Sequence, residues 1–156
     1  MNQGSCSFGL WKVAVAWEGT IVHRVRFMRT ADSGSVPVQF TKFLAGKGRD
    51  FAPLTSAAVS GDSMYARIYR AVSAIPYGET RTYGEIAEVC ETHARVVGNA
   101  MARNPTPLIV PCHRVVGADG LGGFSPDVEI KKELLLLEKK TAKHTPISIL
   151  KYPHNQ

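Results

Sequence analysis

The stretch that decides the fold of this chain is TYGEIAEVCETHARVVGNAMA, residues 82–102. Thr82 and Glu85 form the pattern of a capping box, which predicts a helix that runs to about Cys90. Thr92 can cap a second short helix that continues to the end of the stretch. Two short helices joined by a tight link have the outline of a helix-turn-helix, a motif that places its second helix against DNA. The outline alone is weak evidence, because two adjacent short helices are most often ordinary core helices.

A cysteine and a histidine follow this helix pair, in the segment PCHRV, residues 111–115. An apolar run precedes the proline, so the sequence predicts a buried strand that presents Cys112 at its end, where a ligand could reach it. A thiolate is a strong nucleophile near neutral pH once a base has taken its proton. Adjacent side chains of a strand point to opposite faces, so His113 would act through a bend or a bridging water. The alternative is that Cys112 is a small buried hydrophobic residue.

Hydrophobic patterning outlines the remaining elements. It predicts a β-hairpin over 11–27, a short helix or strand within loops over 29–60, helices over 64–74 and 128–140, a glycine-rich loop over 117–124, and a polar tail over 141–156 with a short strand or docked segment at 147–150. The character of the sequence changes at Gly61. The predicted division is therefore an N-terminal α/β domain, residues 1–60, and a mainly α C-terminal domain, residues 61–156.

The composition is that of an ordinary globular protein, with 44% hydrophobic and 21% charged residues. The apolar runs are too short to span a bilayer, and the first residues lack the pattern of a signal peptide, so we expect a cytoplasmic protein without a membrane partner. The three cysteines and five histidines have no metal-ligand spacing, so we expect no metal. A net charge of +6 suits a polyanionic partner, although a solvated basic surface explains it equally well.

The order of these parts over residues 75–138 resembles the O6-alkylguanine-DNA alkyltransferases, also called methylated-DNA–protein-cysteine methyltransferases. Their core signature is the segment found here at 111–115, and four flanking segments match as well: IPYGE at 75–79, TY at 82–83, ARVVG at 94–98 and NPTP at 104–107. Several independent motifs in the right order cover about half of the chain. The resemblance implies a ribonuclease-H-like N-terminal domain and a C-terminal winged helix-turn-helix domain.

The resemblance also implies a single-turnover DNA-repair reaction that needs no cofactor. Cys112 would accept the alkyl group from guanine O6, His113 would be the base acting through a water, and Glu138 would orient His113. From the residues alone, Glu138 is only one candidate among several carboxylates for that last task. Tyr83 would donate to guanine N3 as the leaving group gains charge, and Asn104 would be the hinge between the recognition helix and the active-site turn.

The partner implied by the resemblance is double-stranded DNA carrying O6-alkylguanine, bound through the minor groove by a monomer in the cytoplasm. The target base must be flipped out of the stack to reach a thiol. Residues matching the family's DNA contacts are Arg95, which would replace the flipped base, with Thr82, Tyr83, Ala94 and Gly98. Residues matching the substrate pocket are Pro111, Val115, Phe124 and Ser125. The carbonyls of Cys112 and Val115 would accept the guanine amino group, and the amide of Ser125 would donate to O6.

Two departures from the family concern the pocket: Phe124 stands where many members have tyrosine, and Pro126 follows Ser125 where others have a different residue. Two other functions also fit parts of this sequence. A sequence-specific winged-helix regulator would need polar side chains for base edges, and the predicted recognition helix offers only Asn99 and two arginines. A cysteine hydrolase with Cys112 and His113 as a dyad would turn over repeatedly, whereas an alkyltransferase stops after one equivalent.

Overall fold

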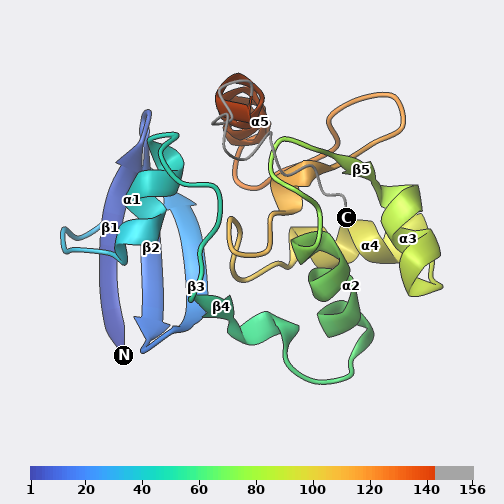
Figure 1. Cartoon of the computed structure of the whole chain (residues 1–156), viewed down its shortest axis with the longest axis horizontal. Helices are drawn as coiled ribbons and strands as arrows, with labels where there is room; N and C mark the ends of the chain where they lie inside the picture. Colours follow the sequence, from blue (N-terminus) through green and yellow to red (C-terminus); the bar gives the residue numbers. More distant parts are fainter. Residues whose placement is uncertain (143–156) are drawn as a thin grey trace, which may run out of the picture.

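The computed structural model describes residues 1–142, so the predicted segment at 147–150 lies outside the described residues. The chain begins with a four-stranded sheet of order β1-β2-β3-β4, shown at the left of Figure 1. Its strands are β1 (Asn2–Phe8), β2 (Trp11–Glu18), β3 (Ile21–Met28) and β4 (Thr55–Ser56). The first three are antiparallel neighbours, and β4 pairs in parallel with β3. The predicted hairpin over 11–27 is confirmed as β2 and β3.

Strand β1 was not predicted, because its sequence NQGSCSF has no alternation of apolar and polar residues. It lies at the edge of the sheet, where polar residues and short side chains are common. The segment between β3 and β4 contains one helix, α1 (Val38–Leu44), and a 3-10 turn follows at Ala57–Val59. Helix α1 covers the sheet with Phe40 and Phe43, which are fully buried.

The second half of the chain holds α2 (Met64–Ser73), α3 (Tyr83–Cys90), α4 (Ala94–Ala102) and α5 (Val128–Ala142). Two short parallel strands, β5 (Arg81–Thr82) and β6 (Val115–Val116), join the start of α3 to the segment after the cysteine. The predicted capping box is present: the Thr82 hydroxyl accepts from Glu85 N–H at 3.0 Å, and the Glu85 carboxylate accepts from Thr82 N–H at 2.7 Å. No helix of the described residues is long and apolar enough to cross a membrane.

Two sequence predictions about this half are wrong in detail. Helix α4 is capped by His93 rather than Thr92, and no side chain satisfies its first amides. Residues Cys112–Arg114 form a 3-10 turn rather than a strand. The reason lies in Pro111, whose ring fixes φ at −76° and whose carbonyl accepts from Arg114 N–H at 2.9 Å, so the chain turns immediately after the proline.

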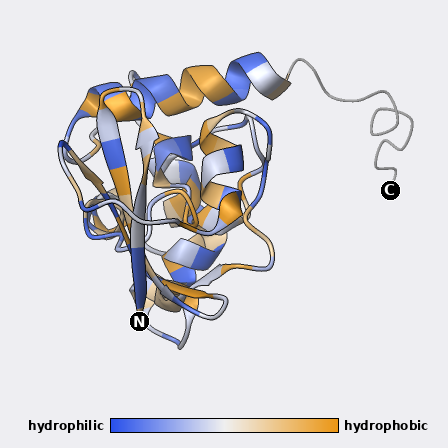
Figure 2. Ribbon diagram, turned by 90° about the vertical axis from the view of Figure 1, so that its left-hand side faces the viewer, coloured by the Kyte–Doolittle hydropathy of each residue, from blue (hydrophilic) through white to orange (hydrophobic). Residues whose placement is uncertain are grey.

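Helix α5 lies between the sheet and the other helices at the top of Figure 1. Apolar and polar segments alternate along it in Figure 2, as expected for an amphipathic helix. Its residues Ile130 and Leu134 belong to the core under the sheet, together with Leu108 from the second half. A second core lies among α2, α3 and α4. The first core is therefore shared between residues on both sides of position 60.

Candidate active site

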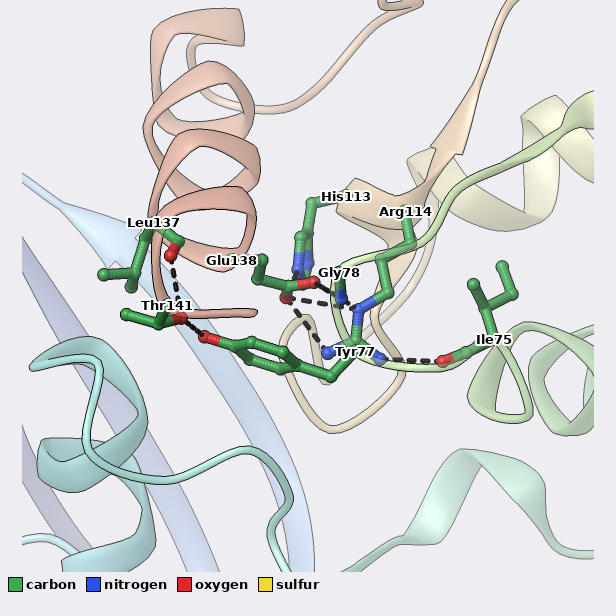
Figure 3. Close-up of polar contacts among 8 residues, drawn as sticks. All are labelled: Ile75, Tyr77, Gly78, His113, Arg114, Leu137, Glu138 and Thr141. Carbon is green, nitrogen blue, oxygen red and sulfur yellow. Dashed lines mark hydrogen bonds and ion pairs between the residues drawn. The ribbon is translucent and has the colours of Figure 1, made fainter. Parts of the chain in front are cut away.

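One buried carboxylate, Glu138 of α5, organises the candidate site (Figure 3). Only 1% of Glu138 is exposed. It accepts hydrogen bonds from His113 Nε2 at 2.5 Å, from Arg114 Nε and Nη2 at 2.9 and 3.0 Å, and from the Gly78 amide at 2.9 Å. Burial alone would raise the pKa of Glu138, but its bonds and charge interactions with His113 and Arg114 outweigh burial and hold that pKa at about 2. Glu138 is therefore ionised at neutral pH.

The contact with Glu138 sets the tautomer of His113. An ionised carboxylate only accepts hydrogen bonds, so Nε2 of His113 carries the hydrogen and Nδ1 presents its lone pair. Within residues 1–142, His113 Nδ1 is the buried side-chain nitrogen that has no hydrogen-bond partner. Burial lowers the pKa of His113, against the opposing effect of Glu138, so the ring is neutral at pH 7. Nδ1 is thus a base that is ready to take a proton.

Residues from the N-terminal half also fix this histidine. Phe43 of α1 meets the His113 ring edge-on, with 6.4 Å between ring centroids. The same phenyl ring contacts Tyr77 at 5.8 Å, and the Tyr77 hydroxyl bonds to the Thr141 hydroxyl of α5 at 2.5 Å. His113 is therefore held by a carboxylate on one side and by aromatic packing on another.

Cys112 begins the 3-10 turn and is 7% exposed. Burial raises the pKa of its thiol to about 11, although the Asn104 amide and the Lys131 ammonium lower it in part. The thiol is therefore protonated at neutral pH and needs a base before it can act as a nucleophile. Within residues 1–142, His113 Nδ1 has no hydrogen-bond partner, so Cys112 does not bond to it directly, and the bridging water stays a prediction.

A cavity of about 570 Å³ opens beside Cys112. The predicted residues that line it are Tyr83, Ala94, Arg95, Gly98, Asn104, Cys112, Phe124 and Ser125. The other predicted residues are not among those that line it: Thr82 caps α3, His113 and Glu138 form the buried pair, and Pro111 and Val115 flank the 3-10 turn. The structure thus brings together, around one thiol, residues from α3, α4 and the glycine-rich loop.

Asn104 holds the turn that leads to Cys112. Its Nδ2 donates to the Val110 carbonyl at 2.9 Å, and its Oδ1 accepts from the Thr106 amide at 3.0 Å. Inside this turn, the buried Leu108 has φ of 80°, a left-handed conformation that is costly for a large side chain. Both ends of the Asn104 amide are therefore used to keep a strained turn in the shape that positions the thiol.

The glycine-rich loop packs closely against Tyr83. Gly122 has φ of 77°, and a Cβ atom at this position would lie 2.6 Å from the Tyr83 hydroxyl oxygen. Only glycine allows the loop to approach the tyrosine this closely. The glycine-rich loop predicted over 117–124 is thus packed against Tyr83 through Gly122.

Lys131 is a site residue that the sequence analysis missed. Its side chain is fully buried, and its Nζ donates to the carbonyls of Val115 at 2.7 Å and Gly123 at 3.2 Å. Burial lowers the pKa of Lys131 to about 8, and the interaction with Cys112 opposes this in part. A signal was present in the sequence, because residues 131, 134 and 138 are spaced i, i+3, i+7 and share one face of a helix.

Nothing in residues 1–142 forms a group of histidine, cysteine or acidic side chains that could hold a metal ion. The site instead combines a buried thiol, a neutral imidazole oriented by a carboxylate, and a cavity whose wall includes Arg95 in the N-terminal turn of α4. This set can deprotonate a cysteine and direct the thiolate at an electrophilic carbon held in the cavity.

Comparison with known proteins adds independent evidence. Residues 63–140 match the family model described as "6-O-methylguanine DNA methyltransferase, DNA binding domain". A methylated-DNA–protein-cysteine methyltransferase of Sulfolobus acidocaldarius is 41% identical over 100 residues, which are 64% of this chain and 63% of that protein. The Mycobacterium tuberculosis protein of the same name is 43% identical over 115 residues, 72% of this chain and 68% of that protein. The match thus spans less than two thirds of the first relative and slightly more than two thirds of the second.

Solved structures agree with these matches. The crystal structure of a Mycobacterium tuberculosis O6-methylguanine methyltransferase is similar with a TM-score of 0.78 and 31% identity, over 95% of this chain and 98% of that chain. A structure of the Mycobacterium tuberculosis protein OGT in complex with DNA has a TM-score of 0.76, over 89% of this chain and 93% of that chain.

Proposed function

Because the chain belongs to the O6-methylguanine DNA methyltransferase family, we propose that it is a single-use DNA-repair protein, which moves an alkyl group from guanine O6 in DNA to Cys112. The observation that carries this proposal is the pairing of Glu138 with His113 beside a buried thiol. The ionised carboxylate leaves Nδ1 of the imidazole as a base. A base is what a thiol with a pKa of about 11 requires.

The reaction follows from these groups. The Cys112 thiol gives its proton, through a bridging water, to His113 Nδ1, and the imidazolium is stabilised by Glu138. The thiolate attacks the alkyl carbon in line with the bond to guanine O6, so a carbon–sulfur bond forms and the carbon–oxygen bond breaks. Tyr83 donates its hydroxyl proton to guanine N3, which neutralises the leaving base. The thioether is stable, so each molecule reacts once, and the reaction as written needs no cofactor.

The proposed substrate is duplex DNA carrying O6-alkylguanine, entered from the minor groove by α4. Arg95 would fill the space of the flipped base, while Thr82, Tyr83, Ala94 and Gly98 contact the backbone around it. The support is that Ala94, Arg95 and Gly98 of α4 line the same cavity as the thiol. Apart from Arg95 and Asn99, the exposed residues of α4 are alanines, which suits a protein that searches for damage in any sequence.

The proposed pocket holds the base by its edges. The carbonyls of Cys112 and Val115 would accept the guanine amino group, and the Ser125 amide would donate to O6. Phe124 would supply an apolar wall, and Pro111, at the start of the Cys112 turn, would complete the pocket. Phe124 and Ser125 line the cavity with Cys112, which supports this assignment. The Val115 carbonyl already accepts from Lys131, which fixes its direction.

The finer description of the molecule belongs to the same proposal. We place a ribonuclease-H-like domain at 1–60 and a winged helix-turn-helix domain at 61–156, acting as a monomer in the cytoplasm in association with DNA. The sheet with its covering helix α1 supports the first assignment, and the capped pair α3 and α4 with the small β5–β6 sheet supports the second.

The test is a stoichiometric transfer assay read by intact mass. Purified protein is mixed with excess duplex containing O6-methylguanine, and we expect a gain of one methyl group on the Cys112 peptide and no further reaction. Cys112→Ser should gain nothing, whereas Cys90→Ser, which removes a buried cysteine outside the cavity, should react like the parent protein. Labelling of Cys112→Ser would overturn the proposal, and repeated turnover would favour the cysteine hydrolase instead.

A further inference from the structure

The wall of the cavity is backed by the N-terminal sheet. Phe124, which lines the cavity beside Cys112, meets Phe27 of β3 edge-on, with 5.7 Å between ring centroids and 66° between ring planes. Phe27 is 6% exposed and belongs to the core under the sheet. A residue outside the cavity, nearly 100 positions earlier in the chain, therefore supports the ring that faces the reacting group.

The strand that carries Phe27 is fixed to the active-site turn by further contacts. The Val25 amide of β3 donates to the Pro105 carbonyl at 2.9 Å. The hydroxyl of Ser56, on the neighbouring strand β4, bonds to the hydroxyl of Thr106 at 2.6 Å in a buried position. These bonds join the sheet edge to the turn that Asn104 holds, so Phe27 keeps a constant position relative to Cys112.

The backbone beside Phe124 supplies much less support. Two glycines, Gly122 and Gly123, precede it, and glycine gives a loop more freedom than any other residue. Lys131 holds the Gly123 carbonyl, but at 3.2 Å, the longer of its two bonds. The position of the Phe124 ring is therefore set in large part by the core that it packs against, in which Phe27 is its aromatic contact.

From these contacts we propose that Phe27 is a positioning residue that sets the size of the alkyl group the cavity admits. The inference rests on the proposed alkyl transfer. A methyl group adds one carbon beyond O6 and needs little space, whereas a benzyl group extends a ring toward the cavity wall. Because Phe27 packs behind it, the Phe124 ring cannot move away from the cavity. The wall therefore hinders the binding of large alkyl groups and leaves small ones unaffected.

The experiment is a competition between two duplexes of the same sequence, one with O6-methylguanine and one with O6-benzylguanine. Intact mass distinguishes the two products on Cys112 and gives the ratio of their rates. Phe27→Leu leaves space behind Phe124. We therefore expect the ratio of the benzyl-transfer rate to the methyl-transfer rate to rise about tenfold, which is the smallest effect usually seen when an apolar pocket changes by one methylene. Methyl transfer alone should change little.

The matched control is Phe40→Leu, which makes the same change in the same core on α1, where Phe40 contacts Phe51 at 4.9 Å. It should lose similar stability and leave the ratio unchanged. If Phe27→Leu does not fold, Phe27→Met conserves more volume and carries the same expectation. In a Phe124→Leu background, Phe27→Leu should have no further effect on the ratio, because the ring through which it acts is gone.

A ratio that is unchanged or lowered in Phe27→Leu, or raised equally in Phe40→Leu, overturns the inference while methyl transfer by the parent protein still supports the proposed function. Failure of the parent protein to accept a methyl group would instead remove the proposed function itself. The two failures are therefore distinguishable within one experiment.

Discussion

Replacing Glu138 by glutamine keeps the shape of the side chain and removes the charge that His113, Arg114 and the Gly78 amide share. The Arg114 guanidinium, which is 6% exposed, then lacks its counter-ion. Removing one partner of a buried ion pair costs about 3–5 kcal/mol. The pKa of Glu138 supports the lower end, since a fall from 4.5 to about 2 corresponds to about 3 kcal/mol. We expect Glu138→Gln to lose about 3 kcal/mol of stability and still fold.

The effect on the reaction should be larger. The glutamine oxygen can accept hydrogen bonds from the Gly78 amide and from Arg114 Nε. The amide NH₂ group then faces His113 Nε2. The NH₂ group donates, so the imidazole must move its hydrogen to Nδ1 and can no longer accept a proton there. The wrong tautomer in a Ser-His-Asp triad slows catalysis by about 10⁴-fold. We expect single-turnover methyl transfer by Glu138→Gln to slow by up to about this factor.

The assay measures the rate of methyl transfer to Cys112 from O6-methylguanine duplex, together with urea unfolding of each variant. Glu133→Gln is the control, because it makes the same change on an exposed position of α5. If Glu138→Gln unfolds cooperatively but reacts within about tenfold of the parent, a barrier difference below ~1.4 kcal/mol, the assigned role of the carboxylate is wrong.

The free energy of unfolding should also depend on pH, because Glu138 titrates differently in the folded and unfolded states. Its pKa is lower in the folded protein than in the unfolded chain, so its contribution is complete above about pH 5 and is lost as the pH falls from the ordinary value of 4.5 toward 2. Urea unfolding at about pH 6 and about pH 3 should show a smaller loss of stability in Glu138→Gln than in the parent. Equal losses in both proteins would contradict this assignment.

Three further predictions concern the residues around the thiol. Lys131→Met leaves the buried Val115 carbonyl and the Gly123 carbonyl without this donor and should cost about 1–3 kcal/mol in urea unfolding, with slower methyl transfer; an unchanged rate would rule out a positioning role. Asn104→Ala removes a group that lowers the pKa of Cys112, so the pH midpoint of its labelling by iodoacetamide should rise. Arg95→Ala should slow reaction with duplex more than reaction with free O6-benzylguanine, and equal losses would argue against a role in base flipping.

Local patterns predicted the elements whose cause is local. The capping box at Thr82 and the helix pair α3 and α4 were predicted because hydrogen bonds between near neighbours determine them. Strand β1 escaped prediction because its pairing with β2, and not its own pattern, makes it a strand. The segment around Cys112 was predicted as a strand because an apolar run precedes Pro111. That run is itself a turn, in which Leu108 has φ of 80°, and a 3-10 turn follows it.

The candidate site divides in the same way. The thiol, the histidine and the cavity residues of α4 were found through motifs, and their catalytic roles stay predictions. Lys131 was missed because a lysine on an amphipathic helix is usually solvated, and only the packed structure shows its ammonium between two carbonyls. Phe27 and Phe43 touch the site through long-range packing, which no local pattern reveals.

The position of Glu138 in the sequence also determines when the active site can form during protein synthesis. The carboxylate follows His113 by 25 residues, on the last helix that the structure describes. A nascent chain therefore carries its cysteine before the group that prepares the neighbouring histidine has been made. Only when α5 docks do the imidazole and Arg114 obtain their partner. For a protein whose reactive group is spent in one event, this order means that base-assisted transfer to Cys112 can begin only after α5 has docked.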